Sequence, residues 1–352
     1  PMPGLTWPVR ERGSALLDGR FWAIEVFIMP LFLIMAGFLM WRSWGKSTPV
    51  KLIRSRAKRL LRPLVFAIAI VLPIDLYLWT LGLVQRGIVE PVKLKSFKFD
   101  DPIADQMWGL SHLWFLLYVF LYVLLFGVAA AMGSRVRMPI PTVSATYKFR
   151  TLVLILAGTA TTVLTLHPEV VWGFQHAFLP VPSKWIYSGM FFAAGCVLAI
   201  ADPEFRWTQC SSHRMSTIGA VCLTAAVTLG IWSLDQRMAG TPPSLAAKAV
   251  LAIMTVVAAA TVSLAILGLS IRYVRSTPTW VQNLAAASFW IYLVHHPFLG
   301  LIHFDLSTVW PDGSSVVKCI VSFSFSAGLS LATYHLFIRK TALGTWLGMS
   351  QT

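Results

Sequence analysis

The sequence predicts an all-α fold, a polytopic bundle of membrane-spanning helices. Of its 352 residues, 57% are hydrophobic and only 12% are charged, and the mean hydropathy is +0.70. A chain this apolar cannot cover a water-facing globule with polar side chains. It also contains repeated apolar runs of about 20 residues, the length that crosses the hydrocarbon core of a bilayer as an α-helix.

Nine apolar runs are long enough to be transmembrane helices. They lie near residues 21–41, 62–84, 112–132, 151–171, 185–201, 215–234, 246–271, 284–303 and 315–338. The fifth run is short and the sixth contains polar Thr and Ser, so these two are also compatible with tilted or re-entrant segments. The 15 Trp and 22 Phe residues suit the aromatic belts at membrane interfaces.

The positive charge of the chain is concentrated in loops. The formal net charge is +15. Basic residues gather in and beside the loop of residues 42–61: Arg42, Lys46, Lys51, Arg54, Arg56, Lys58, Arg59 and Arg62. This is the positive-inside pattern, which places the loop in the cytoplasm and gives no indication of nucleic-acid binding. The same charge can contact anionic lipid head groups.

The other loops alternate in charge as opposite sides of a membrane require. Loop 85–111 mixes basic and acidic residues, which places it outside, and loop 133–150 is basic again. This alternation puts the first twenty residues outside and the C-terminus inside, so the number of visible spans is odd. We therefore expect residues 1–352 to form a single integral-membrane domain that is N-terminally incomplete, with ten spans in the full-length protein.

Ionisable residues inside the predicted spans are the candidate functional groups. A charge at midspan costs roughly 2.5–3.5 kcal/mol on insertion scales, so such residues tend to face a cavity or a partner. Glu25 lies near the outer start of the first span, where it can equally reach the surface. Asp75 follows Pro73 in the outer half of the second span and is better explained as a buried, paired carboxylate.

Three histidines accompany these carboxylates. His112 begins the third span at the exterior side, and the motif FWIYLVHHPF places His295 and His296 inside the eighth span. Adjacent positions do not share a helix face, so at most one of this pair can point at a given cavity. Each histidine, like the aromatic Trp114 and Tyr292, can also be a helix-packing or interfacial residue. The cysteines, Cys196, Cys210, Cys222 and Cys319, form no CxxC pair, and no metal site is predicted.

Five motifs occur in order along nearly the whole chain. They are FIMPLFLIMAGFL (27–39), RSRAKRLLRPL (54–64), SHLWFLLYVF (111–120), SFWIYLVHHPF (288–298) and YHLFIRKTALGTWL (334–347). Together they resemble membrane acyltransferase family 3, and in particular its glucan biosynthesis branch, which includes the periplasmic-glucan succinyltransferases. Two features depart from the family: Ala36 replaces a frequent Ser, and the family's first helix, with its catalytic histidine, has no counterpart here.

The resemblance implies a membrane-bound O-acyltransferase of the bacterial cytoplasmic (inner) membrane. Its donor is expected to be cytoplasmic acyl-CoA, a cosubstrate, with no bound cofactor. The acyl group, succinyl or acetyl, passes to a hydroxyl of an extracytoplasmic glycan. The catalytic candidates are His112, His295, Glu25 and Asp75, and the substrate-binding candidates are Trp114, Tyr292, Arg56, Arg59 and Arg62, the arginines facing the phosphates of CoA.

An alternative from another class is a transporter or flippase. Such a protein would move a glycan or lipid without forming a bond, using Glu25, Asp75 and His295 as a substrate or proton path. The sequence does not indicate the oligomeric state.

Overall fold

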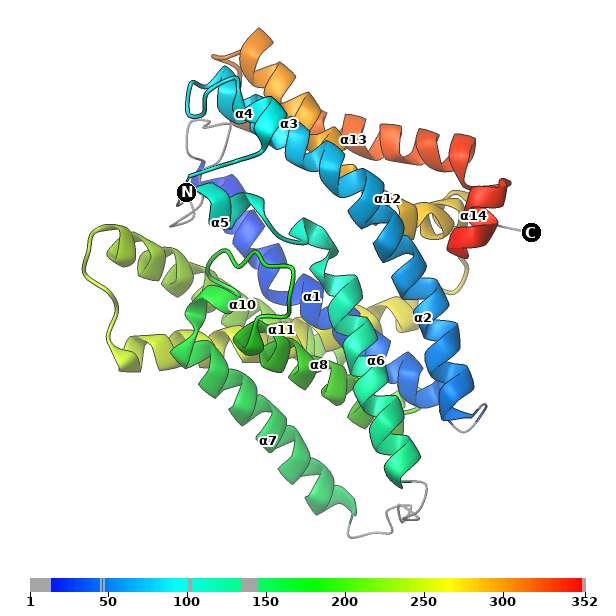
Figure 1. The fold of residues 1–352 in the computed structure, drawn as a ribbon. Helices are drawn as coiled ribbons and strands as arrows, with labels where there is room; N and C mark the ends of the chain where they lie inside the picture. The colour runs from blue at the N-terminus through cyan, green and yellow to red at the C-terminus, as the bar shows by residue number, and fades with distance from the viewer. Residues whose placement is uncertain (1–13, 45, 47, 101–102, 134–144, 350–352) are drawn as a thin grey trace.

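A computed structural model describes residues 14–44, 46, 48–100, 103–133 and 145–349. The secondary-structure elements of these residues are all helices, joined by turns and loops (Figure 1). The long helices are α1 (Ala15–Ser43), α2 (Pro49–Phe66), α3 (Leu72–Gln85), α6 (Trp114–Gly133), α7 (Ala145–Leu166), α8 (Pro182–Ala201), α10 (Ser212–Met238), α11 (Leu245–Tyr273), α12 (Thr279–Val309) and α13 (Ser315–Phe337). The short ones are α4 (Lys93–Ser96), α5 (Ile103–Met107), α9 (Arg206–Cys210) and α14 (Ala342–Leu347), the π-helix η1 (Ala67–Val71) and the 3₁₀ helices η2 (Ser111–Leu113) and η3 (Pro168–Val170).

The predicted spans are confirmed within the described residues. Nine helices there are long and apolar enough to cross a membrane, and each corresponds to one of the nine apolar runs, including the short fifth and the polar sixth. α2, η1 and α3 form one continuous helix of 37 residues, Pro49–Gln85. The chain is therefore a multi-pass helical membrane protein.

The basic segment of residues 42–61 was expected to be a loop, and this expectation is wrong for most of it. α2 begins at Pro49, and the hydroxyl of Thr48 accepts a hydrogen bond from the Lys51 N–H at 3.4 Å. Proline is favoured at the first helical position because the N–H that it lacks would have no partner there. Threonine is favoured at the N-cap because its hydroxyl accepts a hydrogen bond from a free N–H of the first turn. The basic residues after Pro49 therefore lie on a helix.

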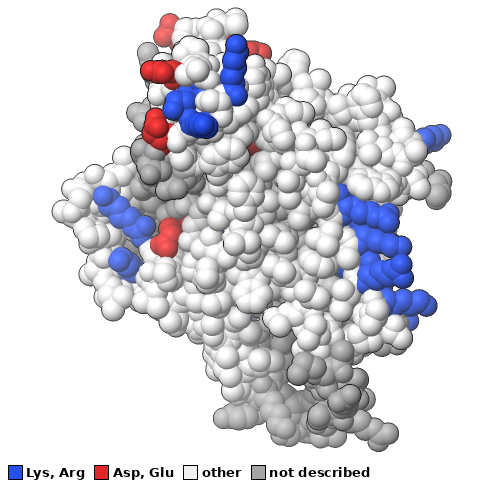
Figure 2. Space-filling model, in the orientation of Figure 1, with Lys and Arg blue, Asp and Glu red and all other residues white. Residues whose placement is uncertain are grey.

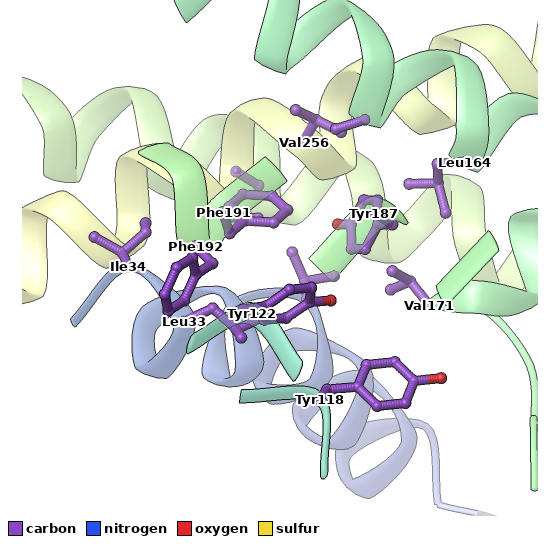
Figure 3. Packing of buried hydrophobic residues seen from close by; sticks show 14 of the residues in the cluster. Leu33, Ile34, Tyr118, Tyr122, Leu164, Val171, Tyr187, Phe191, Phe192 and Val256 are labelled. Carbon is purple, nitrogen blue, oxygen red and sulfur yellow. The ribbon is translucent and has the colours of Figure 1, made fainter. Parts of the chain in front are cut away.

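Buried side chains form two hydrophobic clusters. The larger is built mainly by α1, α6, α7, α8, α10 and α11, and Figure 3 shows part of it around Tyr122, Phe191 and Phe192. The smaller is built mainly by the α2–α3 helix, α12, α13 and α14, together with η2 and the first turn of α6. Trp114 and Phe115, the first residues of α6, pack against both clusters. The start of α6 thus lies at the seam between two helical groups.

Small residues let two helices of the larger group approach closely. A Cβ atom on Gly37 of α1 would collide with the backbone carbonyl of Phe192 in α8, and one on Gly195 of α8 would collide with the carbonyl of Ile34. Such glycine contacts bring helix backbones together in membranes, where packing rather than hydrophobic exclusion drives association. They fix α8, and hence the residues at its start, against α1.

Charged residues gather near opposite ends of the α2–α3 helix. Figure 2 shows a patch of Lys and Arg over α2 and a mixed group of basic and acidic residues beside α3 and α4. A protein surface that crosses the membrane between two such charged ends is uncharged, because charged groups are costly in the bilayer core. This distribution matches the predicted orientation, with α2 on the cytoplasmic side and α4 outside.

The orientation can be tested with single cysteines at two exposed positions, Ser55 in α2 and Ser96 in α4. In a background without the four native cysteines, a membrane-impermeant thiol reagent should label Ser96→Cys in intact cells and Ser55→Cys only after permeabilisation. This result is expected because basic segments such as α2 are retained in the cytoplasm. The reverse labelling pattern would show that the orientation is inverted.

Candidate active site

Asp75 is held in the first turn of α3 by an irregular stretch of helix. Pro73 has no N–H to give to the carbonyl four residues earlier, and the preceding turn is the π-helix η1, in which the Leu72 N–H reaches back to the Ala67 carbonyl. Single π-turns often occur at functional sites. Asp75 is 7% exposed, so its carboxylate lies inside the protein within a membrane span.

His296 of α12 is the direct partner of this carboxylate. Its Nδ1 lies 2.6 Å from Asp75 Oδ1, and its ring stacks on that of Trp79, with centroids 5.7 Å apart. When Nδ1 carries the proton donated to Asp75, Nε2 of a neutral imidazole is left with a lone pair. The pair therefore has the arrangement of an oriented general base.

His112 completes a group of three. Its ring stacks on that of His296, with centroids 5.1 Å apart and planes 19° from parallel. One side-chain donor atom from each of Asp75, His112 and His296 lies within 4.8 Å of the other two. Residues from η2, α3 and α12 thus converge at the seam between the two hydrophobic clusters.

The tautomer of His112 follows from a proline in α12. Pro297 cannot donate to the carbonyl of Leu293, four residues earlier in the helix. His112 Nε2 lies 3.1 Å from this freed carbonyl oxygen and donates to it. Nδ1 is then the acceptor atom of the neutral ring, and the Ser111 hydroxyl lies 3.5 Å from it. The motif LVHHPF therefore supplies both His296 and the acceptor that orients His112.

Tyr292 and His295 lie beside His112. Tyr292, a predicted substrate contact, donates from its hydroxyl to the His112 backbone carbonyl at 2.5 Å and so holds its main chain. The His295 ring is 5.1 Å from that of His112, but its Nδ1 donates to carbonyls of its own helix, those of Ile291 at 3.1 Å and Tyr292 at 2.9 Å. Between the two adjacent histidines, it is His296 that contacts Asp75.

Glu25 and Trp114 form a separate arrangement. Glu25, half-buried on α1, is not part of the group of Asp75, His112 and His296. Its charge interacts with that of Lys184 at the start of α8. Lys184 Nζ lies 4.0 Å from the centre of the Trp114 ring, a cation–π contact. The structure therefore divides the predicted residues between two neighbouring polar groups.

Asp75, His112 and His296 have the donor types that a divalent metal ion accepts. Two ligands of one tetrahedral zinc ion lie about 3.3 Å apart, since each metal–ligand bond is close to 2 Å. Asp75 Oδ1 and His296 Nδ1 are closer than this, at 2.6 Å. These two atoms fit a direct hydrogen bond better than a shared metal.

A family model described as an acyltransferase domain matches residues 6–348, nearly the whole chain. The chain belongs to the acyltransferase 3 family. No curated protein and no solved structure matches it. The protein is thus a membrane acyltransferase that transfers groups other than aminoacyl groups. This decides against the transporter alternative.

Two residues of this acyltransferase were not singled out from the sequence, Ser111 and His176. The Ser111 N–H donates to His176 Nε2 at 2.6 Å, and His176 Nδ1 donates to the Gln106 carbonyl at 2.7 Å. Ser111 has a positive φ of 50°, a conformation that a non-glycine residue adopts at a cost. His176 therefore holds the strained turn that delivers His112. These contacts join segments 65 and 70 residues apart, so no local pattern could reveal them.

His176 must be neutral to accept this hydrogen bond. Burial lowers the pKa of His176 below its ordinary value of 6.5, opposed by the hydrogen bond to Gln106 and the charge of Asp75. The unfolded chain then binds the proton more readily, so the contribution of His176 to stability is complete above pH 6.5 and is lost as the pH falls toward the lowered pKa.

We predict that His176→Gln will reduce the loss of thermal stability between pH 7.5 and pH 5.5. The measurement is the melting temperature of the detergent-purified protein at both values. His213→Gln is the matched control, because His213 is exposed and lies far along the chain on α10. An unchanged pH slope in the His176 variant would contradict the assignment.

Proposed function

We propose that this acyltransferase moves an acyl group, succinyl or acetyl, from cytoplasmic acyl-CoA to a hydroxyl of an extracytoplasmic glycan. The observation that carries the proposal is the buried Asp75–His296 hydrogen bond with His112 stacked beside it. An acyl transfer needs a base for the acceptor hydroxyl, and an imidazole oriented by a carboxylate is a common solution.

The lone pair on His296 Nε2 takes the hydroxyl proton while the hydroxyl oxygen attacks the thioester carbonyl carbon. The carbon–sulfur bond then breaks, and the thiolate of CoA takes the proton back from His296 Nε2 as it leaves, which restores the neutral imidazole. Asp75 stabilises the transient imidazolium through the 2.6 Å hydrogen bond to Nδ1. His112, with its Nδ1 as acceptor, orients the hydroxyl.

The donor is proposed to arrive from the side of α2. Arg62 precedes Asp75 by 13 positions on one continuous helix, which corresponds to about 20 Å. An extended donor held by its phosphates at α2 can therefore point its thioester toward Asp75. A polybasic helix end at the cytoplasmic surface is suited to anionic phosphates.

The acceptor is proposed to enter from the loops on the opposite side. An open cavity of about 490 Å³ there is lined by Ala104, Trp108, His176, Ala177, Phe178 and Leu179. Trp108 and Phe178 are each 45% exposed, and flat aromatic rings can pack against sugar rings. Because His176 also contacts Ser111, this cavity adjoins the turn that carries His112. The glucan biosynthesis branch and a bacterial inner membrane are part of the same proposal.

The test is transfer of radiolabelled acyl groups by the full-length protein, purified and placed in vesicles. Acyl-CoA is added on the α2 side and a β-glucan acceptor on the other. Acylated glycan and free CoA should form together in equal amounts. Formation of acylated lipid or protein without acylated glycan would refute the proposed acceptor.

The three arginines predicted to contact CoA have different surroundings. Arg56 donates to the Ser43 hydroxyl at 3.2 Å, and Arg62 donates to the Trp346 carbonyl of α14 at 3.1 Å. Arg59 is exposed. Arg56 and Arg62 thus help to attach α2 to neighbouring segments, and Arg59 is the arginine best placed to meet a donor in solution.

We predict that Arg59→Gln will raise the KM for acyl-CoA roughly tenfold with little change in the KM for the glycan, since a charge-assisted hydrogen bond is worth about 1.5–3 kcal/mol. Arg56→Gln and Arg62→Gln should also lower the amount of folded protein. Lys58→Gln is the control for loss of one exposed charge on the same helix. If Arg59→Gln and Lys58→Gln behave alike, Arg59 contributes only to the general positive field.

A further inference from the structure

Ser111 has a hydroxyl group that takes no part in the proposed direct transfer. It precedes His112 at the start of the helix Ser111–Ala129, and both side chains are half-buried. Ser111 Oγ lies 3.5 Å from His112 Nδ1. Because His112 Nε2 donates to the Leu293 carbonyl, Nδ1 carries the lone pair of the neutral ring, and the Ser111 hydroxyl is the donor in this contact. The two side chains therefore have the arrangement of a nucleophile and its base, which is often loose before substrate binds.

The main chain at Ser111 is strained. Its φ of 50° costs free energy in a residue other than glycine, and such strain is concentrated at active sites. Nucleophilic serines of α/β-hydrolases lie on strained turns that expose the hydroxyl. The Ser111 N–H donates to His176 Nε2 at 2.6 Å, a contact that joins segments 65 residues apart and fixes this conformation. Glycine adopts a positive φ without cost, whereas serine supplies a hydroxyl at the same point.

Ser111 lies between the catalytic group and the proposed acceptor cavity. On one side, the ring of its neighbour His112 is 5.1 Å from that of His296, measured between centroids. On the other side, His176 both accepts the Ser111 N–H and lines the open cavity of about 490 Å³. An acyl group on Ser111 is thus held beside the imidazoles and next to the cavity. The start of a long helix also stabilises negative charge that develops there during the reaction.

We propose that Ser111 is a nucleophile that takes the acyl group from CoA and passes it to the acceptor. This inference rests on the proposed function. The overall reaction and the role of His296 toward the glycan hydroxyl stay the same, and the single transfer is divided into two. Donor and acceptor then need not occupy the site together, which suits substrates that arrive from opposite sides of a membrane.

In the first transfer, His112 Nδ1 takes the proton of the Ser111 hydroxyl while Oγ attacks the thioester carbonyl carbon. The carbon–sulfur bond breaks, and the thiolate of CoA takes the proton from Nδ1 as it leaves. In the second transfer, His296 Nε2 takes the proton of the glycan hydroxyl, whose oxygen attacks the carbonyl carbon of the Ser111 ester. The bond between this carbon and Oγ breaks, and Oγ takes the proton from His296. The two oriented imidazoles thus serve two successive attacks.

The experiment mixes the full-length protein with radiolabelled acetyl-CoA or succinyl-CoA without any glycan and quenches the mixture with acid. A burst of free CoA, at most one per protein molecule, should accompany label on the peptide that contains Ser111, identified by mass spectrometry. A β-glucan added before the quench should remove this label and become acylated. His112→Ala should take no label, whereas His296→Ala should take the label and keep it when the glucan is added.

Ser111→Gly is the decisive variant, because glycine is compatible with the positive φ and the substitution removes the hydroxyl. It should fold to the wild-type level, take no label and lower kcat by roughly 10² or more. Ser111→Cys, in the background without the four native cysteines, should form a thioester that hydroxylamine cleaves at neutral pH. Ser322→Ala is the matched control, because Ser322 Oγ on α13 lies 3.4 Å from His303 Nδ1. This control should be labelled like the wild type.

The outcomes separate this inference from the proposed function. Acylated glycan formed without label on Ser111, label on a different residue, or near wild-type turnover in Ser111→Gly would refute the role of Ser111 and leave the direct transfer intact. Label on Ser111 that no glycan removes would support the nucleophile and refute the proposed acceptor. If the wild type neither takes label nor acylates a glycan, both proposals are wrong.

Discussion

Replacing His296 with Ala in the full-length protein should lower kcat by roughly 10² or more, the range typical for loss of a general base. The structure gives His296 the hydrogen bond to Asp75 at 2.6 Å that sets its tautomer. Asp75→Asn should cause a loss of similar order, because an amide can donate to Nδ1 and so favour the wrong tautomer. The KM for acyl-CoA should change little, since neither side chain lies on α2.

His303→Ala is the matched control for this prediction. His303 lies seven residues after His296 on α12, two helical turns away, and is also half-buried. The measurement is single-turnover acyl transfer, with the amount of folded protein in the membrane determined for each variant. Equal losses at His296 and His303, or near wild-type turnover in His296→Ala, would contradict the role of His296 as the base.

A chelator provides a second check on the same group. If Asp75 and His296 act through their hydrogen bond, treatment with EDTA followed by removal of the chelator should leave kcat unchanged. Loss of activity that zinc restores would show that Asp75, His112 and His296 hold a metal ion instead. The experiment thus separates the two kinds of chemistry that these three side chains allow.

The spans could be predicted from the sequence because bilayer thickness imposes a length and a hydrophobicity on each helix. Their ends were less predictable. α2 extends to Pro49 through a strongly basic segment that hydropathy alone assigns to a loop. Helix propensity and the Thr48 cap continue the helix beyond its apolar part, since basic residues are tolerated where the helix leaves the membrane.

The candidate site was only partly predictable for a different reason. Asp75 and His296 are separated by 221 positions, and a single sequence contains no information on which distant spans are neighbours. For this reason His295 was the histidine of this pair predicted to be catalytic, whereas it is His296 that contacts Asp75. One local signal was available: Pro297 leaves the Leu293 carbonyl without its helical donor, which predicts that some side chain must satisfy it. That side chain is His112.

Replacing His112 with Ala should also lower kcat by roughly 10² or more if its imidazole takes part in proton transfer. His112→Gln should recover part of this loss if the side chain only holds the acceptor hydroxyl, because an amide can both donate to Leu293 and accept a hydrogen bond.

Pro297→Ala tests the orientation of His112 without altering its chemistry. It returns an N–H to the Leu293 carbonyl, which competes with His112 Nε2 for that oxygen. We therefore expect Pro297→Ala to lower kcat by a smaller factor than His112→Ala and to have no further effect in a His112→Ala background. The measurement is a double-variant cycle on kcat. Additive effects of the two substitutions would show that Pro297 acts on the helix alone, and near wild-type turnover in His112→Ala would return His112 to a helix-packing role.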